Sequence, residues 1–166
     1  MTGGIAMKTV IVFSSKYGAT EKCVGILKAQ LGDVCDVVNL SVDVRPDLAG
    51  YDTVLLGSSI YAGKMRPEVI NYVTDNELLL RNKNLGVLIC CKDAHSEALH
   101  YIEENLPEWL NNNAFIRMAV GHEINLEKMN FLERNILKYV FKVKNSYSKL
   151  DEAALADIVA AVNALK

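Results

Sequence analysis

The stretch KTVIVFSSKYGAT, residues 8–20, decides the fold of this chain. Its first part, 8–13, is a β-branched apolar run without strict alternation, which is typical of a strand buried on both faces. Its second part is a loop of hydroxyl side chains around Gly18. From Thr20, which has the character of a helix cap, apolar residues recur at helical spacing as far as Leu31, and Gly32 follows as a stop signal. Strand, short polar loop and helix in this order predict the first unit of an α/β protein.

The same alternation continues to the end of the chain. Turn residues and apolar spacing predict further strands over 34–40, 53–57, 85–91 and 115–120, and helices over 67–80, 96–110, 126–144 and 151–165. Parallel strands need a crossover connection, which these helices supply. We therefore expect a doubly wound α/β fold: a five-stranded parallel sheet with helices on both faces. In such folds ligands bind beyond the carboxyl ends of the strands.

Length and composition narrow the class of protein. The 166 residues suit a single domain, 1–166, with residues 1–7 as a flexible N-terminal extension. A formal net charge of −2 gives no electrostatic footprint for nucleic acid, which we exclude as a partner. The four cysteines lack zinc or thioredoxin spacing and the three histidines are scattered, so no metal site is expected. A cytoplasmic protein without a transmembrane segment is the simplest interpretation.

The loop Ser14–Thr20 has the outline of a phosphate cradle. A helix N-terminus offers unpaired N–H groups and the positive end of its dipole, and serine or threonine hydroxyls add donors without bulk. Gly18 lets the backbone close on an anion. The alternative is an ordinary capped helix after a loop, since serine and threonine are common at such caps.

The residues of this loop also resemble the first-loop pattern of the flavodoxin family. Places in that pattern are filled in register by Ile11, Val12, Phe13, Ser15, Gly18 and Thr20, while Val24 stands where the family prefers alanine. The resemblance implies a three-layer fold with strand order 2-1-3-4-5 and FMN as cofactor. It also implies that the FMN phosphate is wrapped by Ser14, Ser15, Lys16, Tyr17, Gly18, Ala19 and Thr20, of which Lys16 departs from the usual small residue.

Two further loops would flank the flavin ring. The resemblance places Ser58, Ser59, Ile60, Tyr61, Ala62 and Gly63 on one side, and Cys91, Lys92 and Asp93 on the other. Tyr61 either stacks on the flavin or packs under the helix that follows. Positive charge in these loops, from Lys64, Arg66 and Lys92, would stabilise a reduced, anionic flavin and raise its potential.

A narrower resemblance concerns residues 56–63, LGSSIYAG, and the basic segment near the end of the chain. Both are similar to the menaquinone-dependent protoporphyrinogen oxidase branch of flavodoxin-like proteins. This implies an oxidoreductase in which FMN oxidises a porphyrinogen-like substrate and a quinone accepts the electrons. Residues 92–113 lack the resemblance, which favours the alternative of an electron carrier that docks on redox partner proteins and has no small-molecule substrate. A third alternative is a binding module that has lost its flavin.

The basic segment Leu126–Lys149 carries six basic and two acidic side chains, a local excess of +4 in an acidic chain. An apolar stripe runs along it: Met129, Leu132, Ile136, Val140 and Val143, broadened by Leu137 and Phe141. Such a helix can lie on an anionic membrane at the inner face, where a quinone is met, or contact a partner protein. The alternative is a helix packed on the sheet with a solvated basic face.

Overall fold

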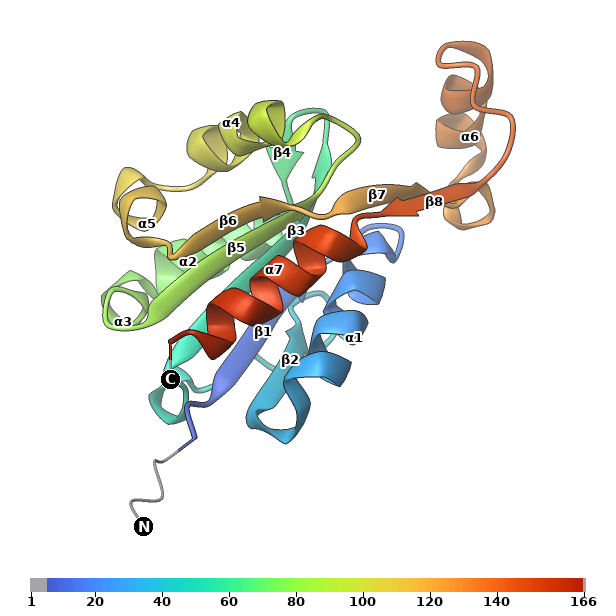
Figure 1. Cartoon of the computed structure of the whole chain (residues 1–166). Coiled ribbons are helices and arrows are strands. Elements are labelled where there is room, and N and C mark those ends of the chain that lie inside the picture. Colours follow the sequence, from blue (N-terminus) through green and yellow to red (C-terminus); the bar gives the residue numbers. More distant parts are fainter. Residues whose placement is uncertain (1–5, 166) are drawn as a thin grey trace.

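The structure is a computed structural model and describes residues 6–165 (Figure 1). Its central sheet is parallel and contains β1 (Thr9–Ser14), β2 (Cys35–Asn39), β3 (Thr53–Tyr61), β5 (Asn84–Cys90) and β6 (Ile116–Ala119). They lie in the order β2-β1-β3-β5-β6. When only these five parallel strands are numbered along the chain, this is the predicted order 2-1-3-4-5, which is confirmed. Residues 1–5 of the expected N-terminal extension lie outside the described residues.

Helices cover both faces of this sheet. On one face α1 (Ala19–Leu31) lies beside α7 (Glu152–Asn163); on the other lie α2 (Pro67–Asp75), α3 (Glu77–Leu80), α4 (His95–Asn105) and α5 (Glu108–Asn113). Successive residues of β1 serve the two layers in turn. Val10 and Val12 join the core under α2 and α4, while Ile11 and Phe13 join the core under α1 and α7. All six residues of β1 are buried, as expected of a strand covered on both faces.

Some predicted helices divide in two. The segment predicted over 67–80 is interrupted at Asn76, and the one predicted over 96–110 ends at Asn105. Pro107 explains the second break, because proline has no N–H to donate within a helix and its ring clashes with the preceding turn. It stands instead as the residue before α5, with an extended backbone. Two short 3-10 helices, η1 (Gly32–Val34) and η2 (Leu48–Gly50), lie in the connections on either side of β2.

The third strand is longer than predicted. β3 continues through Tyr61 and turns at Ala62 and Gly63 into β4 (Lys64–Met65), with which it pairs antiparallel. Both turn residues have positive φ, 49° and 74°, as expected of a tight two-residue hairpin. The prediction that a loop begins at Ser58 is therefore wrong: residues 58–61 belong to the strand.

The largest departure from the prediction lies between residues 121 and 150, which we call the arm. It contains β7 (Gly121–Ile124), η3 (Leu126–Lys128), α6 (Phe131–Tyr139) and β8 (Tyr147–Leu150), and β7 pairs antiparallel with β8. The predicted helix over 126–144 is thus nine residues long, and a strand that was not predicted lies between it and the last helix. The alternative prediction, in which this helix packs on the sheet, is also wrong, since α6 has no buried residue and stands away from the sheet in Figure 1.

Within residues 6–165, no helix has both the length and the apolar character needed to cross a membrane.

Candidate functional site

The loop Ser14–Gly18 leads from the carboxyl end of β1 into α1. Gly18 adopts a left-handed conformation with φ of 93° and precedes α1 without any side chain capping that helix. Its backbone N–H donates to Oγ of Ser15 at 3.0 Å, which closes the loop on itself. Because the first N–H groups of a helix have no partner within it, they point toward this loop as free donors. The alternative assumed a serine or threonine cap, and no side chain caps α1.

Thr20 lies inside the first turn of α1, so the prediction that it caps the helix is also wrong. Its side chain is fully buried and Oγ1 has no hydrogen-bond partner among the described residues. A buried hydroxyl without a partner is costly, and this side chain lies against Gly57 of β3 and the Cys90 thiol of β5. Ser14 is also fully buried, but its hydroxyl lies 2.9 Å from that of Ser41, which follows β2.

Lys16 connects the loop to two other parts of the molecule. Its Nζ lies 2.6 Å from Oε1 of Glu133 on α6 and 4.2 Å from the centroid of the Tyr61 ring. The ion pair raises the pKa of Lys16 and lowers that of Glu133. Beside them, burial raises the pKa of Tyr17, whose hydroxyl has no partner among residues 6–165. The loop is thus held against the arm by a charge pair.

The predicted residues of β3 divide between interior and surface. Ser58 is fully buried, and its Oγ accepts from the N–H of Arg66 at 2.8 Å, so this hydroxyl is used within the fold. Oγ of Ser59 is buried without a partner among the described residues. Tyr61 is 55% exposed, so the alternative that it packs under α2 is wrong.

The residues after β5 face the same end of the sheet. Cys91 is buried, and burial raises the pKa of its thiol to about 11, which makes it an inert thiol at neutral pH. Nζ of Lys92 lies 5.4 Å from the ring centroid of Phe141 on the arm. Asp93 accepts a hydrogen bond from the Tyr101 hydroxyl at 2.7 Å.

Residues from α4 and the arm complete the surroundings, and the sequence patterns did not single them out. Nδ2 of Asn105 donates to the Gly63 carbonyl at 3.0 Å, and its Oδ1 accepts from the N–H of Met65 at 3.2 Å, which fixes the β3–β4 turn. From the arm, Glu133 pairs with Lys16 of the loop Ser14–Gly18, and the Lys128 Nζ lies near Gly18. We call this loop the phosphate loop, after the group that we expect it to bind. A capping box, in which Asn130 and Glu133 bond each other's backbone, was a signal for the start of α6 that was available in the sequence.

Taken together, the parallel sheet, its order and the loop after β1 define a flavodoxin-like α/β protein. The chain belongs to the flavodoxin domain family, whose model matches residues 10–151. It is 32% identical over 97 residues to Flavodoxin 1 of Salmonella typhimurium, an alignment that covers 57% of this chain and 55% of that protein. The match thus spans only about half the length of that relative.

Solved structures agree on the fold. Oxidised Flavodoxin 1 from Bacillus cereus superposes with a TM-score of 0.57 at 13% identity, covering 95% of this chain and 97% of that one. Rubredoxin oxygen:oxidoreductase of Desulfovibrio gigas gives a TM-score of 0.56 at 18% identity, and the similarity covers 95% of this chain but 37% of the larger protein. At these identities the likeness concerns the three-layer fold alone.

The loop after β1 fits the phosphate of FMN, the cofactor of flavodoxins. It offers uncapped helix N–H groups and a glycine in a left-handed conformation. Within residues 6–165, no three His, Cys, Asp or Glu side chains gather as a metal site would require.

Proposed function

We propose that the chain binds FMN at the loop Ser14–Thr20 and works as an electron carrier that docks on redox partner proteins. The observation that carries the proposal is the uncapped N-terminus of α1, which follows the left-handed Gly18 at the carboxyl end of β1. Membership of the flavodoxin domain family and the partial match to a protein named flavodoxin support the same function.

Each loop would have its own task. Ser15, the left-handed Gly18 and the first N–H groups of α1 would hold the phosphate. Tyr61 and the residues 91–93 would border the two sides of the ring, which lies beyond the strand ends. FMN, when bound, supplies one-electron and two-electron transfer, and the chain would orient it and set the charge around it.

The net positive charge near the ring is smaller than the sequence suggests, because some of the basic side chains have acidic partners. Arg66 is paired with Glu68 at 2.9 Å and Lys16 with Glu133 at 2.6 Å, so both cations are compensated locally. Lys64 and Lys92 have no ion-pair partner among the described residues. They are the groups that would stabilise a reduced flavin, and we expect neutralising them to lower its potential.

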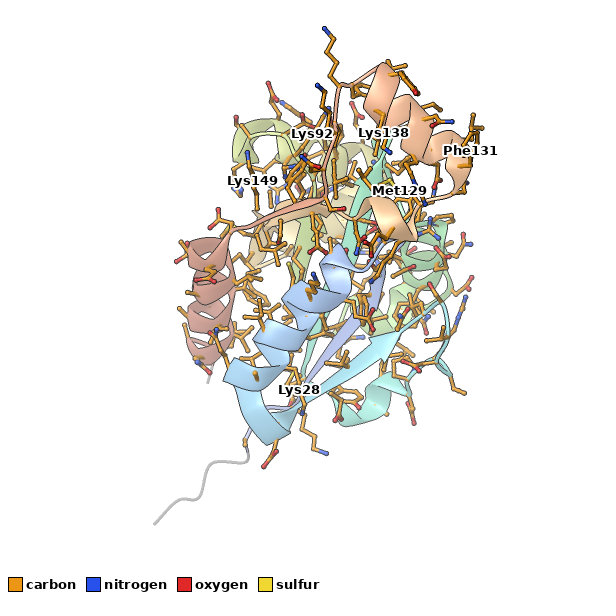
Figure 2. The ribbon with its side chains drawn as sticks, turned by 90° about the vertical axis from the view of Figure 1, so that its right-hand side faces the viewer. Lys28, Lys92, Met129, Phe131, Lys138 and Lys149 are labelled. Atoms are coloured by element: carbon orange, nitrogen blue, oxygen red, sulfur yellow. The ribbon has the colours of Figure 1, made fainter. Side chains whose placement is uncertain are left out.

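The arm favours a second function, oxidation of a porphyrinogen-like substrate with a quinone as acceptor. Six large apolar side chains of the arm are exposed: Phe131 (79%), Leu132 (68%), Ile136 (41%), Tyr139 (80%), Val140 (67%) and Phe141 (57%). Phe131 points away from the body of the molecule in Figure 2. Together with Lys142 and Lys144, this surface has the mixture of apolar and basic groups that suits an anionic bilayer, where quinones are dissolved.

Steady-state turnover separates the two functions. The FMN-loaded protein is mixed with a porphyrinogen and a quinone, with and without anionic vesicles, and in parallel its photoreduced form is mixed with an oxidised haem protein. A carrier transfers electrons to the haem protein and shows no saturable porphyrinogen oxidation. Saturable oxidation that vesicles enhance, and that Phe131→Ser with Phe141→Ser reduces, would instead support the second function.

A further inference from the structure

Lys128 of the arm lies directly over the phosphate loop. A Cβ placed on Gly18 would come within 2.8 Å of the Lys128 Nζ, so the amino group is in contact range of the glycine at the end of the loop. The left-handed backbone of Gly18 is what favours glycine at this position, since the amino group stands at the end of a flexible side chain. The contact joins segments far apart in the sequence, which explains why no local motif reveals it.

The backbone that carries Lys128 is anchored on both sides. Leu126 and Met129 are buried, with 7% and 9% exposure, and they fix η3 against the body of the protein. The Leu126 N–H donates to Oγ of Ser146 at 2.9 Å, and Oδ1 of Asn125 accepts from the N–H of Glu127 at 3.2 Å. Lys128 is thus presented by an ordered turn, although its own side chain is exposed.

Charge at the mouth of the loop singles out this lysine. Lys16 is occupied by Glu133, and the second oxygen of that carboxylate accepts from the Asn130 N–H at 3.3 Å. Lys128 has no ion-pair partner among the residues that the structure describes. A positive charge next to the uncapped N-terminus of a helix is the chemistry of an anion site.

We infer that Lys128 binds the phosphate of FMN, so that the arm contributes a residue to the site. The inference rests on the proposed FMN site and adds a residue to it. A phosphate monoester carries close to two negative charges at neutral pH, and a lysine binds it as a point charge. Loss of one charge-assisted hydrogen bond weakens binding by about 10-fold to 100-fold.

Comparing FMN with riboflavin tests this directly, because riboflavin has the same ring and lacks the phosphate. Dissociation constants for both are measured by flavin fluorescence with the full-length protein and its Lys128→Gln, Lys128→Arg and Lys8→Gln variants. Lys8 is exposed at the opposite end of β1, so its variant controls for the change in net charge. We expect Lys128→Gln to weaken FMN at least 10-fold without affecting riboflavin, and Lys128→Arg to retain most of the affinity.

The other outcomes overturn the inference in distinguishable ways. If Lys128→Gln leaves FMN affinity unchanged, or weakens both flavins equally, then Lys128 does not bind the phosphate, while the FMN site itself stands. If Lys8→Gln weakens FMN as much as Lys128→Gln does, net charge is the cause. If the folded wild-type protein binds neither flavin, the proposed function fails together with the inference.

Discussion

Replacing Gly121 by alanine tests whether the arm is joined to the sheet as the structure shows. Gly121 is the first residue of β7 and has a φ of 84°, and an added Cβ would come within 2.1 Å of the Lys149 carbonyl oxygen and 2.8 Å of the Asp151 backbone nitrogen. Both contacts are backbone atoms, so no side-chain rotation can relieve them. The strand pair β7–β8 would have to separate at its base.

The cost follows from the contacts that would be lost. A left-handed backbone costs alanine about 1–2 kcal/mol relative to glycine. Two hydrogen bonds at this junction, Asp151 N–H to the Val120 carbonyl at 2.9 Å and Cys91 N–H to the Gly121 carbonyl at 3.0 Å, are worth about 1 kcal/mol each. We expect Gly121→Ala to lower the free energy of unfolding by about 3–4 kcal/mol, a large part of the ~5–15 kcal/mol typical of a domain.

Equilibrium unfolding in urea measures the change, and Gly25→Ala is the matched control. Gly25 is exposed within α1 and a Cβ there would meet nothing within 4 Å, so alanine should stabilise that helix by about 1 kcal/mol. At a typical urea dependence of about 2 kcal/mol/M, the Gly121→Ala midpoint should fall by about 1.5–2 M. A midpoint equal to that of the wild type would refute the β7–β8 junction described here.

Three further predictions concern the surroundings of the site. Asn105→Ala removes both hydrogen bonds that fix the β3–β4 turn and should cost about 1–2 kcal/mol in urea unfolding; no loss of stability would contradict this role. Burial raises the pKa of Tyr72 to about 12, so the neutral phenol favours the folded state and this contribution, complete below pH 10, is lost as the pH rises toward 12. Tyr72→Phe should flatten the fall in thermal stability between these pH values, and an unchanged slope would contradict it. A double-mutant cycle on Lys16 and Glu133 should give a coupling of about 0.5–1 kcal/mol that weakens in high salt, whereas a salt-independent coupling would argue against a charge pair.

The parallel sheet was predictable from the sequence because each strand has its own local signal. The run 10–13 is uniformly apolar, and hydroxyls and a glycine follow at the point where the chain must turn. Strand order came from family resemblance and was confirmed. The break before α5 was also visible, since Pro107 excludes a continuous helix, and it was missed because the apolar spacing on either side continues in register.

The arm could not be predicted in the same way. Its apolar residues recur at helical spacing, and such a stripe normally indicates burial against a sheet. Here the helix ends at Tyr139, and Lys142 adopts a left-handed backbone with φ of 55°. The strands β7 and β8 have only four residues each, so neither carries a pattern strong enough to distinguish it from a loop. They are also separated in the sequence by α6, so no short turn marks them as a pair.

The residues of the candidate site also differ in how far the sequence alone could indicate them. A phosphate site at residues 14–20 can be proposed from the sequence because these residues are consecutive, and their binding of phosphate stays a prediction. Lys128, Glu133 and Asn105 could not be proposed in this way, since each reaches the site from a distant segment and only the folded chain brings them together.

The most direct test of the central claim is the visible absorption spectrum of the purified protein after incubation with FMN and removal of excess flavin by gel filtration. We predict a retained, shifted flavin band at about one equivalent per chain, because each chain has one phosphate loop. A protein that is folded by circular dichroism and elutes without flavin would contradict it.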